Sequence, residues 1–396
     1  MNRNLNAWNP AETVTAENAL ACLEGVLSEE GSTESAVRTL VNGDEIFPAL
    51  IAAAEAAERT INFETYIYWS GEISHRFAEV LSARARAGVE VNVIVDWYGC
   101  AKMDQSIIES MRSAGVRANV YNRPRWWCFW EGNHRTHRKI MVVDGRVGFT
   151  GGVGIADCWS GDANDETEWR DDHFRMEGPA VRGLQRVFEE NWRVVGGEGL
   201  EGDGHFPELG AAGAVAVQVY SSSPGRGVSE AYEANRLALR SAKKNLRLNP
   251  SYFVPDPEME AELIRAVQRG VRVEVIVPGR HIDETAVRLA SRARWDRLLE
   301  GGVEIFEFKP TMIHRKAVIV DDFWLMTGSA NFDNRSFRIN DEVNVNVIDH
   351  DVVAKSIRLF EADKQRCERI TLEGWLARPW TEKIADYFAN LFRAQL

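Results

Sequence analysis

Two copies of one short motif carry the residue types best suited to chemistry in this sequence. The first runs from His137 to Asp144 (HRKIMVVD) and the second from His314 to Asp321 (HRKAVIVD). A histidine can act as nucleophile, base or acid near neutral pH, and a lysine two residues later supplies a compact positive charge. Two such pairs could surround one phosphate, with one histidine as nucleophile and the other as proton donor to the leaving alkoxide.

The alternation of side chains along a strand predicts which motif residues share a face. Each lysine, Lys139 or Lys316, lies two residues after its histidine, so the pair should project from one face. Asp144 and Asp321 lie seven residues after their histidines and should face the other way. We expect them to form a structural salt bridge or anchor a loop, and not to contact their own histidines.

The elements around the motif repeat as well. The segment 87–96 (AGVEVNVIVD) resembles 269–278 (RGVRVEVIVP), and each follows a helix-like stretch that is preceded by a strand-like segment. The pattern predicts an α/β fold of two duplicated α/β/α domains with pseudo-twofold symmetry and the active site at their interface. We expect an N-terminal extension (1–40), a first domain (41–200) and a second domain with a C-terminal helix (214–396). The Gly-rich stretch 196–213 is the expected linker.

Composition narrows the class of protein. The 396 residues carry a net charge of −12 and are 45% hydrophobic, which is typical of a globular chain and argues against disorder. A protein that coats nucleic acid by bulk charge would be basic. No apolar run approaches the roughly 20 residues of a membrane-spanning helix. The five cysteines are scattered without a CxxC pair, which favours a reduced, cytosolic protein without a zinc site.

On these motifs the chain resembles the phospholipase D superfamily, the HKD enzymes. Within that superfamily it resembles bacterial cardiolipin synthases of a short form without N-terminal transmembrane helices. The resemblance rests on segments such as HRKIMVVDGRVGFTGG (137–152), WRDDHFRMEGPAV (169–181) and GSANFDNRSFRINDEVN (328–344). The first copy has Gly154 where the family usually has Asn and the second copy has Asn331, so the first half lacks one polar contact.

The resemblance implies a ping-pong reaction through a phosphohistidine, without metal or cofactor. His137 is the expected nucleophile and His314 the acid/base, and the reverse order stays open. An acidic residue should hold the second ring nitrogen of each histidine: Glu342, and Asp171 with Asp172 as the alternative. The expected phosphate ligands are the two lysines with Gly152, Ser329 and Asn331. Asp144 and Asp321 complete the family's catalytic motif.

The implied function is phosphatidyl transfer, with phosphatidylglycerol as substrate and cardiolipin as product, by a cytoplasmic protein attached peripherally to the inner face of the cell membrane. One alternative is a phospholipase D that uses water or a small alcohol. A nuclease is disfavoured by the acidic charge, so no nucleic-acid partner is expected, and a lipid-binding scaffold would not need both histidines. The oligomeric state stays open.

An aromatic run precedes the first motif and includes Trp126, Trp127 and Trp130. Residues 121–140 hold five Arg or Lys and one Glu, a net charge of +4. Aromatic rings beside arginines suit a lipid headgroup boundary, so these tryptophans are candidate substrate contacts. Core packing at the domain interface is the open alternative. Apolar residues at helical spacing in 384–392 could likewise dock onto the protein or dip into a membrane surface.

Overall fold

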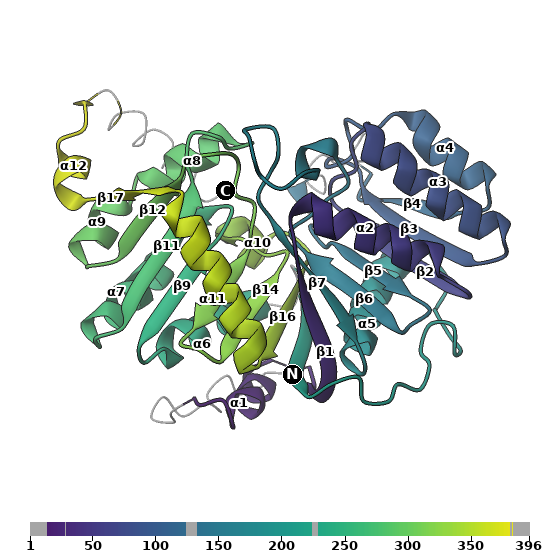
Figure 1. The fold of residues 1–396 in the computed structure, drawn as a ribbon, viewed down its shortest axis with the longest axis horizontal. Helices are drawn as coiled ribbons and strands as arrows, with labels where there is room; N and C mark the ends of the chain where they lie inside the picture. Colours follow the sequence, from purple (N-terminus) through teal and green to yellow (C-terminus); the bar gives the residue numbers. More distant parts are fainter. Residues whose placement is uncertain (1–13, 28, 124–132, 224–228, 381, 383–396) are drawn as a thin grey trace.

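The computed structural model describes residues 14–27, 29–123, 133–223, 229–380 and 382. Within these residues, fifteen strands form one continuous sheet that runs across the molecule (Figure 1). The first half of the chain contributes β1 (Ser32–Val41), β2 (Thr60–Thr65), β3 (Glu90–Asp96), β4 (Arg117–Tyr121), β5 (Ile140–Val143), β6 (Val147–Gly151) and β7 (Asp172–Glu177). The second half contributes β8 (Val215–Ser222), β9 (Asn245–Asn249), β11 (Arg272–Pro278), β12 (Glu304–Phe308), β13 (Ala317–Val320), β14 (Trp324–Gly328), β16 (Glu342–Ile348) and β17 (Cys367–Ile370).

The order of the strands confirms the duplication. From the centre outward, the first half reads β1-β7-β6-β5-β2-β3-β4 and the second β8-β16-β14-β13-β9-β11-β12, with β17 added at the edge. β1 and β8 pair antiparallel and join the two halves. The expected strand at 87–96 is β3, and its counterpart is β11. Gly88 and Gly270, at φ 93° and 90°, follow the preceding helices in the left-handed conformation that favours glycine.

Helices cover both faces of the sheet. They are α1 (Ala19–Val26), α2 (Asn42–Glu55), α3 (Glu72–Arg86), α4 (Gln105–Ser113), α5 (Ala180–Val194), α6 (Glu230–Ser241), α7 (Pro257–Gln268), α8 (Thr285–Arg292), α9 (Trp295–Glu300), α10 (Asn334–Arg338), α11 (His350–Gln365) and α12 (Leu372–Leu376). Three short elements complete the fold: a 3-10 turn (Asp157–Trp159) and the parallel pair β10 (Phe253–Val254) and β15 (Phe332–Asp333).

The apolar core is divided on one face of the sheet and shared on the other. One cluster belongs to the first half with α2, α3 and α4, and another to the second half with α1, α6, α7, α9 and α12. A third cluster lies under α5 and α11 and takes residues from strands of both halves, for example Phe174, Val219 and Val345. The two halves therefore share one packed layer, which fixes their relative position.

The structure refines the expected domain limits in two places. Residues 32–40, expected in the N-terminal extension, form most of β1, which pairs with β7 along six residue pairs and so belongs to the first half. The stretch 196–213, predicted as the linker, has no helix or strand and packs on the first half. His205 in it is buried, and Thr60 Oγ1 donates a hydrogen bond to Gly204 O (2.6 Å).

Among the described residues, no helix combines the length and the apolar character that crossing a membrane requires.

Candidate active site

Both His-x-Lys pairs lie at the interface of the two halves. They were expected within strands, but they immediately precede β5 and β13, which begin at Ile140 and Ala317. The backbone there bonds across the interface instead of within its own half. His137 N donates to Asp341 O (2.8 Å), and His314 N donates to Arg170 O (2.7 Å). Each histidine is thus placed by the chain segment that leads to the partner half's carboxylate.

Each histidine ring is held by a carboxylate from the other half. His137 Nδ1 lies 3.1 and 3.0 Å from the two oxygens of Glu342, and His314 Nδ1 lies 2.9 Å from Asp171 Oδ2. All four side chains are buried. Because the carboxylate accepts at Nδ1, it leaves Nε2 of each ring as the atom able to react.

The structure separates Asp171 from its neighbour Asp172. Asp171 contacts His314 and also accepts a hydrogen bond from Trp159 Nε1 (3.1 Å). Asp172 points the other way, into ion pairs with Arg170 and Arg315. This arrangement favours Asp171 as the partner of the histidine and gives Asp172 a structural place.

The two lysines differ in their surroundings. Both donate to the carbonyl oxygen of their own histidine, at 2.8 Å. Lys316 Nζ also donates to Ser251 Oγ (2.7 Å) and lies 3.1 and 3.2 Å from the ring nitrogens of His314. Lys139 Nζ instead lies 5.5 Å from the ring centre of Tyr66. The ammonium of Lys316 is therefore the more tightly constrained of the two.

Burial, together with repulsion between the cations, lowers the pKa values of the histidines and lysines of the site. Burial lowers the pKa of His137 to about 4 and that of Lys139 to about 7, with Lys316 adding to the second shift. Burial likewise lowers the pKa of Lys316 to about 8 and lowers the pKa of His314 well below its usual range. Two cations in one dry site repel each other, so an anion that neutralises them would be bound strongly.

The pKa values of the two carboxylates that hold the histidines are shifted in opposite directions. Burial raises the pKa of Asp171 to about 6. Burial would also raise the pKa of Glu342, but the neighbouring His137 and Lys139 and the Ser329 hydroxyl outweigh it, so the pKa is lowered. Glu342 is consequently the more firmly ionised partner.

The motif aspartates lie at the far ends of β5 and β13, away from the histidines. Asp144 accepts hydrogen bonds from the backbone N–H groups of residues 58–60, and Asp321 from those of residues 243–245, at 2.7–3.3 Å. Both adopt a left-handed backbone conformation, with φ of 52° and 51°. This matches the loop-anchor interpretation of the strand alternation and places them outside contact with the reacting groups.

The segments after β6 and β14 make the two halves chemically unequal. Ser329 Oγ donates to Glu342 Oε2 (2.5 Å). At the equivalent Gly152, a Cβ atom would lie 2.3 Å from the Asp171 carboxylate, so the indole of Trp159 supplies the hydrogen bond there instead. Asn331 is buried, with no hydrogen-bond partner for its Oδ1 among the described residues. At Gly154 a Cβ would crowd Ile67, so that corner of the first half is filled by an apolar side chain.

Aromatic rings from outside the two repeated motifs enclose both histidines. Trp159 and Trp169 lie 5.3 and 5.7 Å from the ring of His314, and Tyr66 lies 5.1 Å from the ring of His137. Trp169 stands two residues before Asp171 in the family-like WRDD segment, which is the one sequence signal that could have pointed to it.

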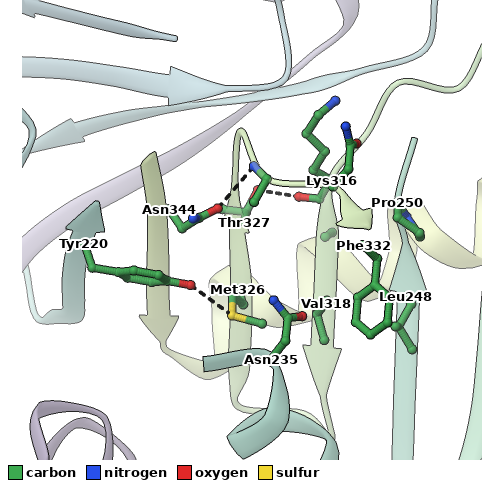
Figure 2. A pocket seen from close by; sticks show the side chains of 13 residues that line it. Tyr220, Asn235, Leu248, Pro250, Lys316, Val318, Met326, Thr327, Phe332 and Asn344 are labelled. Atoms are coloured by element: carbon green, nitrogen blue, oxygen red, sulfur yellow. Dashed lines mark hydrogen bonds between the residues drawn. The ribbon is translucent and has the colours of Figure 1, made fainter. Parts of the chain in front are cut away.

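A small pocket lies behind Lys316 in the second half (Figure 2). Its volume is about 30 Å³, which is room for about one water molecule. Thr327 Oγ1 donates to the backbone oxygen of Lys316 (2.8 Å), and the lysine side chain extends away from the pocket (Figure 2). The pocket is too small for a lipid phosphate, so it is not the substrate site.

Trp126, Trp127, Trp130 and the segment 384–392 lie outside the described residues. His134 lies three residues before His137, a spacing that some metal-binding histidines share. In the structure His134 Nε2 lies 3.2 Å from Asp341 Oδ1. In the part of the chain that the structure describes, no group of three or more His, Cys, Asp or Glu residues could hold a metal ion.

A duplicated α/β sheet in which two His-x-Lys pairs meet across a pseudo-twofold interface defines the phospholipase D-like class. The comparisons agree with that class. The family model "Cardiolipin synthase, PLD-like domain" matches residues 50–192 and 236–364. The chain belongs to this cardiolipin synthase family of phospholipase D-like proteins.

Individual relatives are similar over most of the chain. The chain is 34% identical to "Cardiolipin synthase" of Geobacillus kaustophilus, over 91% of this chain and 72% of that protein. It is 31% identical to "Minor cardiolipin synthase ClsB" of Bacillus subtilis, over 88% of this chain and 86% of that protein. Among solved structures, phosphatidylserine synthase of Haemophilus influenzae superposes with a TM-score of 0.71 at 13% identity, covering 91% of this chain and 95% of that chain, which shows a shared fold.

Proposed function

We propose that this protein is a phosphatidyltransferase that makes cardiolipin and glycerol from two molecules of phosphatidylglycerol. The observation that carries the proposal is the pair of buried histidines, each held at Nδ1 by a carboxylate of the other half and flanked by a lysine. The family membership supplies the lipid class. The anionic phosphate of the donor would offset the repulsion between Lys139 and Lys316.

The first chemical step forms a bond between a histidine nitrogen and phosphorus. Nε2 of His137 attacks the phosphorus of the donor lipid, and the bond from phosphorus to the headgroup glycerol oxygen breaks. His314 gives its Nε2 proton to that oxygen, so glycerol leaves neutral. The negative charge of the bound phosphate favours the protonated form of His314, which opposes the effect of burial on the pKa of that ring.

In the second step the proton moves in the opposite direction, toward His314. One of the two free headgroup hydroxyls of a second phosphatidylglycerol gives its proton to His314, and its oxygen attacks phosphorus. The phosphorus–nitrogen bond breaks, cardiolipin leaves, and His137 returns to its starting state. Lys139 and Lys316, together with Ser329, Asn331 and the Gly152 backbone, would stabilise the charge that gathers on the non-bridging oxygens.

The different partners of the two rings support His137 as the nucleophile. Glu342 contacts His137 with both oxygens and keeps a lowered pKa, so a full negative charge can support the cationic phosphohistidine. Burial raises the pKa of Asp171 to about 6, so this carboxylate is less fully ionised and stabilises a cationic His314 ring less strongly. That weaker support suits a ring that must give and take a proton.

A substrate with an activated leaving group would test this assignment. Phosphatidyl-p-nitrophenol releases a phenolate that needs no proton, so His314→Ala should keep part of its first-step rate with it, whereas His137→Ala should not. The reverse pattern would assign the nucleophile to His314.

The function itself is tested by incubating the pure protein with phosphatidylglycerol vesicles and separating the lipids. Cardiolipin with release of glycerol is the expected result. Phosphatidic acid alone would point to a hydrolytic phospholipase D, and cleavage of an oligonucleotide without lipid turnover would overturn the proposal. His137→Ala and His314→Ala should each abolish turnover, whereas His75→Ala, which replaces an exposed histidine on α3, should keep it.

We further propose that the protein works at the inner face of the cell membrane as a peripheral protein.

A further inference from the structure

The loop after β3 presents two adjacent aromatic rings to solvent. Trp97 is 44% exposed and Tyr98 is 54% exposed. Within the described ranges, no other two exposed large apolar side chains are neighbours in the sequence. An exposed tryptophan–tyrosine pair costs free energy in water, and such rings are enriched where a protein meets a membrane interface.

Cations accompany these rings although the chain as a whole is acidic. The guanidinium of Arg135 lies 4.5 Å from the ring centre of Tyr98, and Lys102 Nζ lies 4.0 Å from that of Trp69. A hollow of about 340 Å³ opens beside Trp97, with Met103 and Ile108 in its wall and Arg112 and Arg123 also lining it. Aromatic, apolar and cationic side chains in one place match the headgroup region of an anionic bilayer.

A line of aromatic rings continues from this loop to the candidate active site. Trp69 Nε1 donates a hydrogen bond to Gly99 O in the loop (2.9 Å). The ring of Trp69 lies 6.4 Å from that of Trp169, which in turn lies 5.7 Å from His314. The backbone of the loop that carries the exposed rings is therefore linked, through Trp69 and Trp169, to the wall of the site that a lipid phosphate would have to reach.

The loop is also held rigidly and is bonded to the first motif. Asp96 is buried at the end of β3, and its Oδ1 accepts hydrogen bonds from Tyr98 N and Gly99 N, both at 2.9 Å. Its Oδ2 accepts one from Thr136 N (3.0 Å), the residue before His137. A preorganised aromatic loop loses little conformational entropy on binding, which favours a role in docking.

We propose that the loop Trp97–Lys102, with Arg135, is the surface by which this protein docks on an anionic phospholipid bilayer. The inference deepens the proposed function and rests on it for the lipid substrate. Trp97 and Tyr98 enter the headgroup layer, Lys102 and Arg135 contact lipid phosphates, and the aromatic line directs the lipid headgroup toward the histidines.

Vesicle cosedimentation tests this surface in the full-length protein. The probes are vesicles of phosphatidylglycerol mixed with phosphatidylcholine, and vesicles of phosphatidylcholine alone. The Trp97→Ala/Tyr98→Ala variant should bind the mixed vesicles about tenfold more weakly or worse, since two interfacial rings are lost. The single variants Trp97→Gln and Tyr98→Gln should fall between this variant and the unchanged protein. Trp380→Ala, which removes a ring that is 71% exposed, is the matched control and should bind normally.

Turnover of monomeric short-chain phosphatidylglycerol separates docking from catalysis and from folding. The loop variants should keep that turnover within about twofold, because the substrate needs no membrane. Unchanged vesicle binding by the double variant would overturn the proposal, and so would an equal loss in Trp380→Ala. A change from dimer to monomer in light scattering without a change in vesicle binding would mean that the loop is a protein interface, which also overturns it. If the unchanged protein binds vesicles through this loop but transfers no phosphatidyl group, the proposed function fails and the docking surface stands.

Discussion

At the scale of single residues, each catalytic candidate of one half depends on the other half. Glu342 follows His314 in the sequence but contacts His137, and Asp171 follows His137 but contacts His314. Neither motif histidine is held by a carboxylate of its own half. A reaction that needs a nucleophile and a proton donor on opposite sides of one phosphorus atom is served by this exchange, because the two rings are held from opposite sides of the interface.

Replacing Glu342 with Gln should lower kcat by about 10²- to 10⁴-fold with little effect on stability, the range seen when a histidine loses its supporting carboxylate. The amide keeps the size of the side chain but removes the charge that stabilises the ring of His137. Steady-state turnover of phosphatidylglycerol measures the effect. Glu368→Gln, which alters an exposed carboxylate on β17, is the control. Retention of more than a tenth of the rate by Glu342→Gln would contradict the assigned role.

The pH dependence of kcat/KM follows from the shifted pKa values of groups in the site. Asp171, with a pKa raised to about 6, carries its charge above that pH and loses it as the pH falls through about 6. Lys139 and Lys316, with pKa values lowered to about 7 and about 8, are cations below these values and lose their charge as the pH rises through them. These three charges are all present between about pH 6 and 7, and the lowered pKa of His314, which must be protonated to act as the acid, places the maximum of the bell-shaped profile toward the acidic end of that range.

The same reasoning predicts a difference between kcat/KM and kcat. A bound phosphate stabilises both ammonium groups and raises their pKa values, so the alkaline limb of kcat should lie at higher pH than that of kcat/KM. Lys139→Arg should move the alkaline limb of kcat/KM upward, since a guanidinium stays charged throughout this range. A profile that is flat from pH 5 to 9 would show that these lysines do not govern substrate binding.

At the scale of elements, the turns after β6 and β14 determine how much room each carboxylate has. Gly152 N donates to Asp172 O (3.2 Å), and Ser329 N donates to Val343 O (2.8 Å), so the two turns have the same backbone arrangement. Only their side chains differ. Ser329 donates a hydrogen bond to Glu342. Gly152, with no side chain, leaves room for Asp171, which accepts its hydrogen bond from the indole of Trp159.

Making the two turns alike should therefore harm the first one. In Gly152→Ser the new Cβ would lie 2.3 Å from Asp171 Oδ1, which forces the carboxylate away from His314. We expect at least a tenfold loss of turnover and about 1–3 kcal/mol of destabilisation by overpacking. Gly210→Ser, where a Cβ meets nothing within 4 Å, is the control. Thermal unfolding and turnover of the two variants should differ clearly, and equal behaviour would contradict the steric argument.

How much the sequence can predict is clear from the same elements. The repeated pattern predicts β3 and β11 and the loop-anchoring role of Asp144 and Asp321, because strand alternation and motif spacing are local properties. Local spacing cannot tell which half supplies the partner of a histidine, since that depends on how the halves dock. Trp159 was missed for the same reason, because it approaches Asp171 and His314 only through tertiary folding.

At the scale of the whole molecule, buried ion pairs tie the second motif to both halves. Arg315, the middle residue of the motif, pairs with Asp172 of β7 and lies 3.8 Å from Asp363 of α11. Arg170 bridges the same two carboxylates, at 2.5 Å to Asp172 and 2.8 Å to Asp363. These four side chains are buried, so each charge depends on its partners for compensation. Together with the core cluster under α5 and α11, they make the interface part of the folded core.

Removing one member of this network should destabilise the whole protein. Arg315→Met keeps much of the volume but leaves Asp172 with one guanidinium in place of two and weakens the compensation of Asp363. Breaking a buried pair in this way typically costs about 3–5 kcal/mol, because the remaining carboxylates lose compensation away from water. The exposed pair of Lys309 with Glu368 provides the control, since Lys309→Met should cost less than about 1 kcal/mol.

Urea unfolding monitored by circular dichroism measures both variants. If the network joins the halves, Arg315→Met should shift the midpoint of a single cooperative transition. If the network served only one half, the variant would show two transitions, with the first half unfolding at an unchanged urea concentration. A midpoint shift no larger than that of Lys309→Met would contradict a stabilising role for the buried charges. The cooperative outcome is expected because Asp172 belongs to the first half, Asp363 to the second, and both face the same two guanidinium groups.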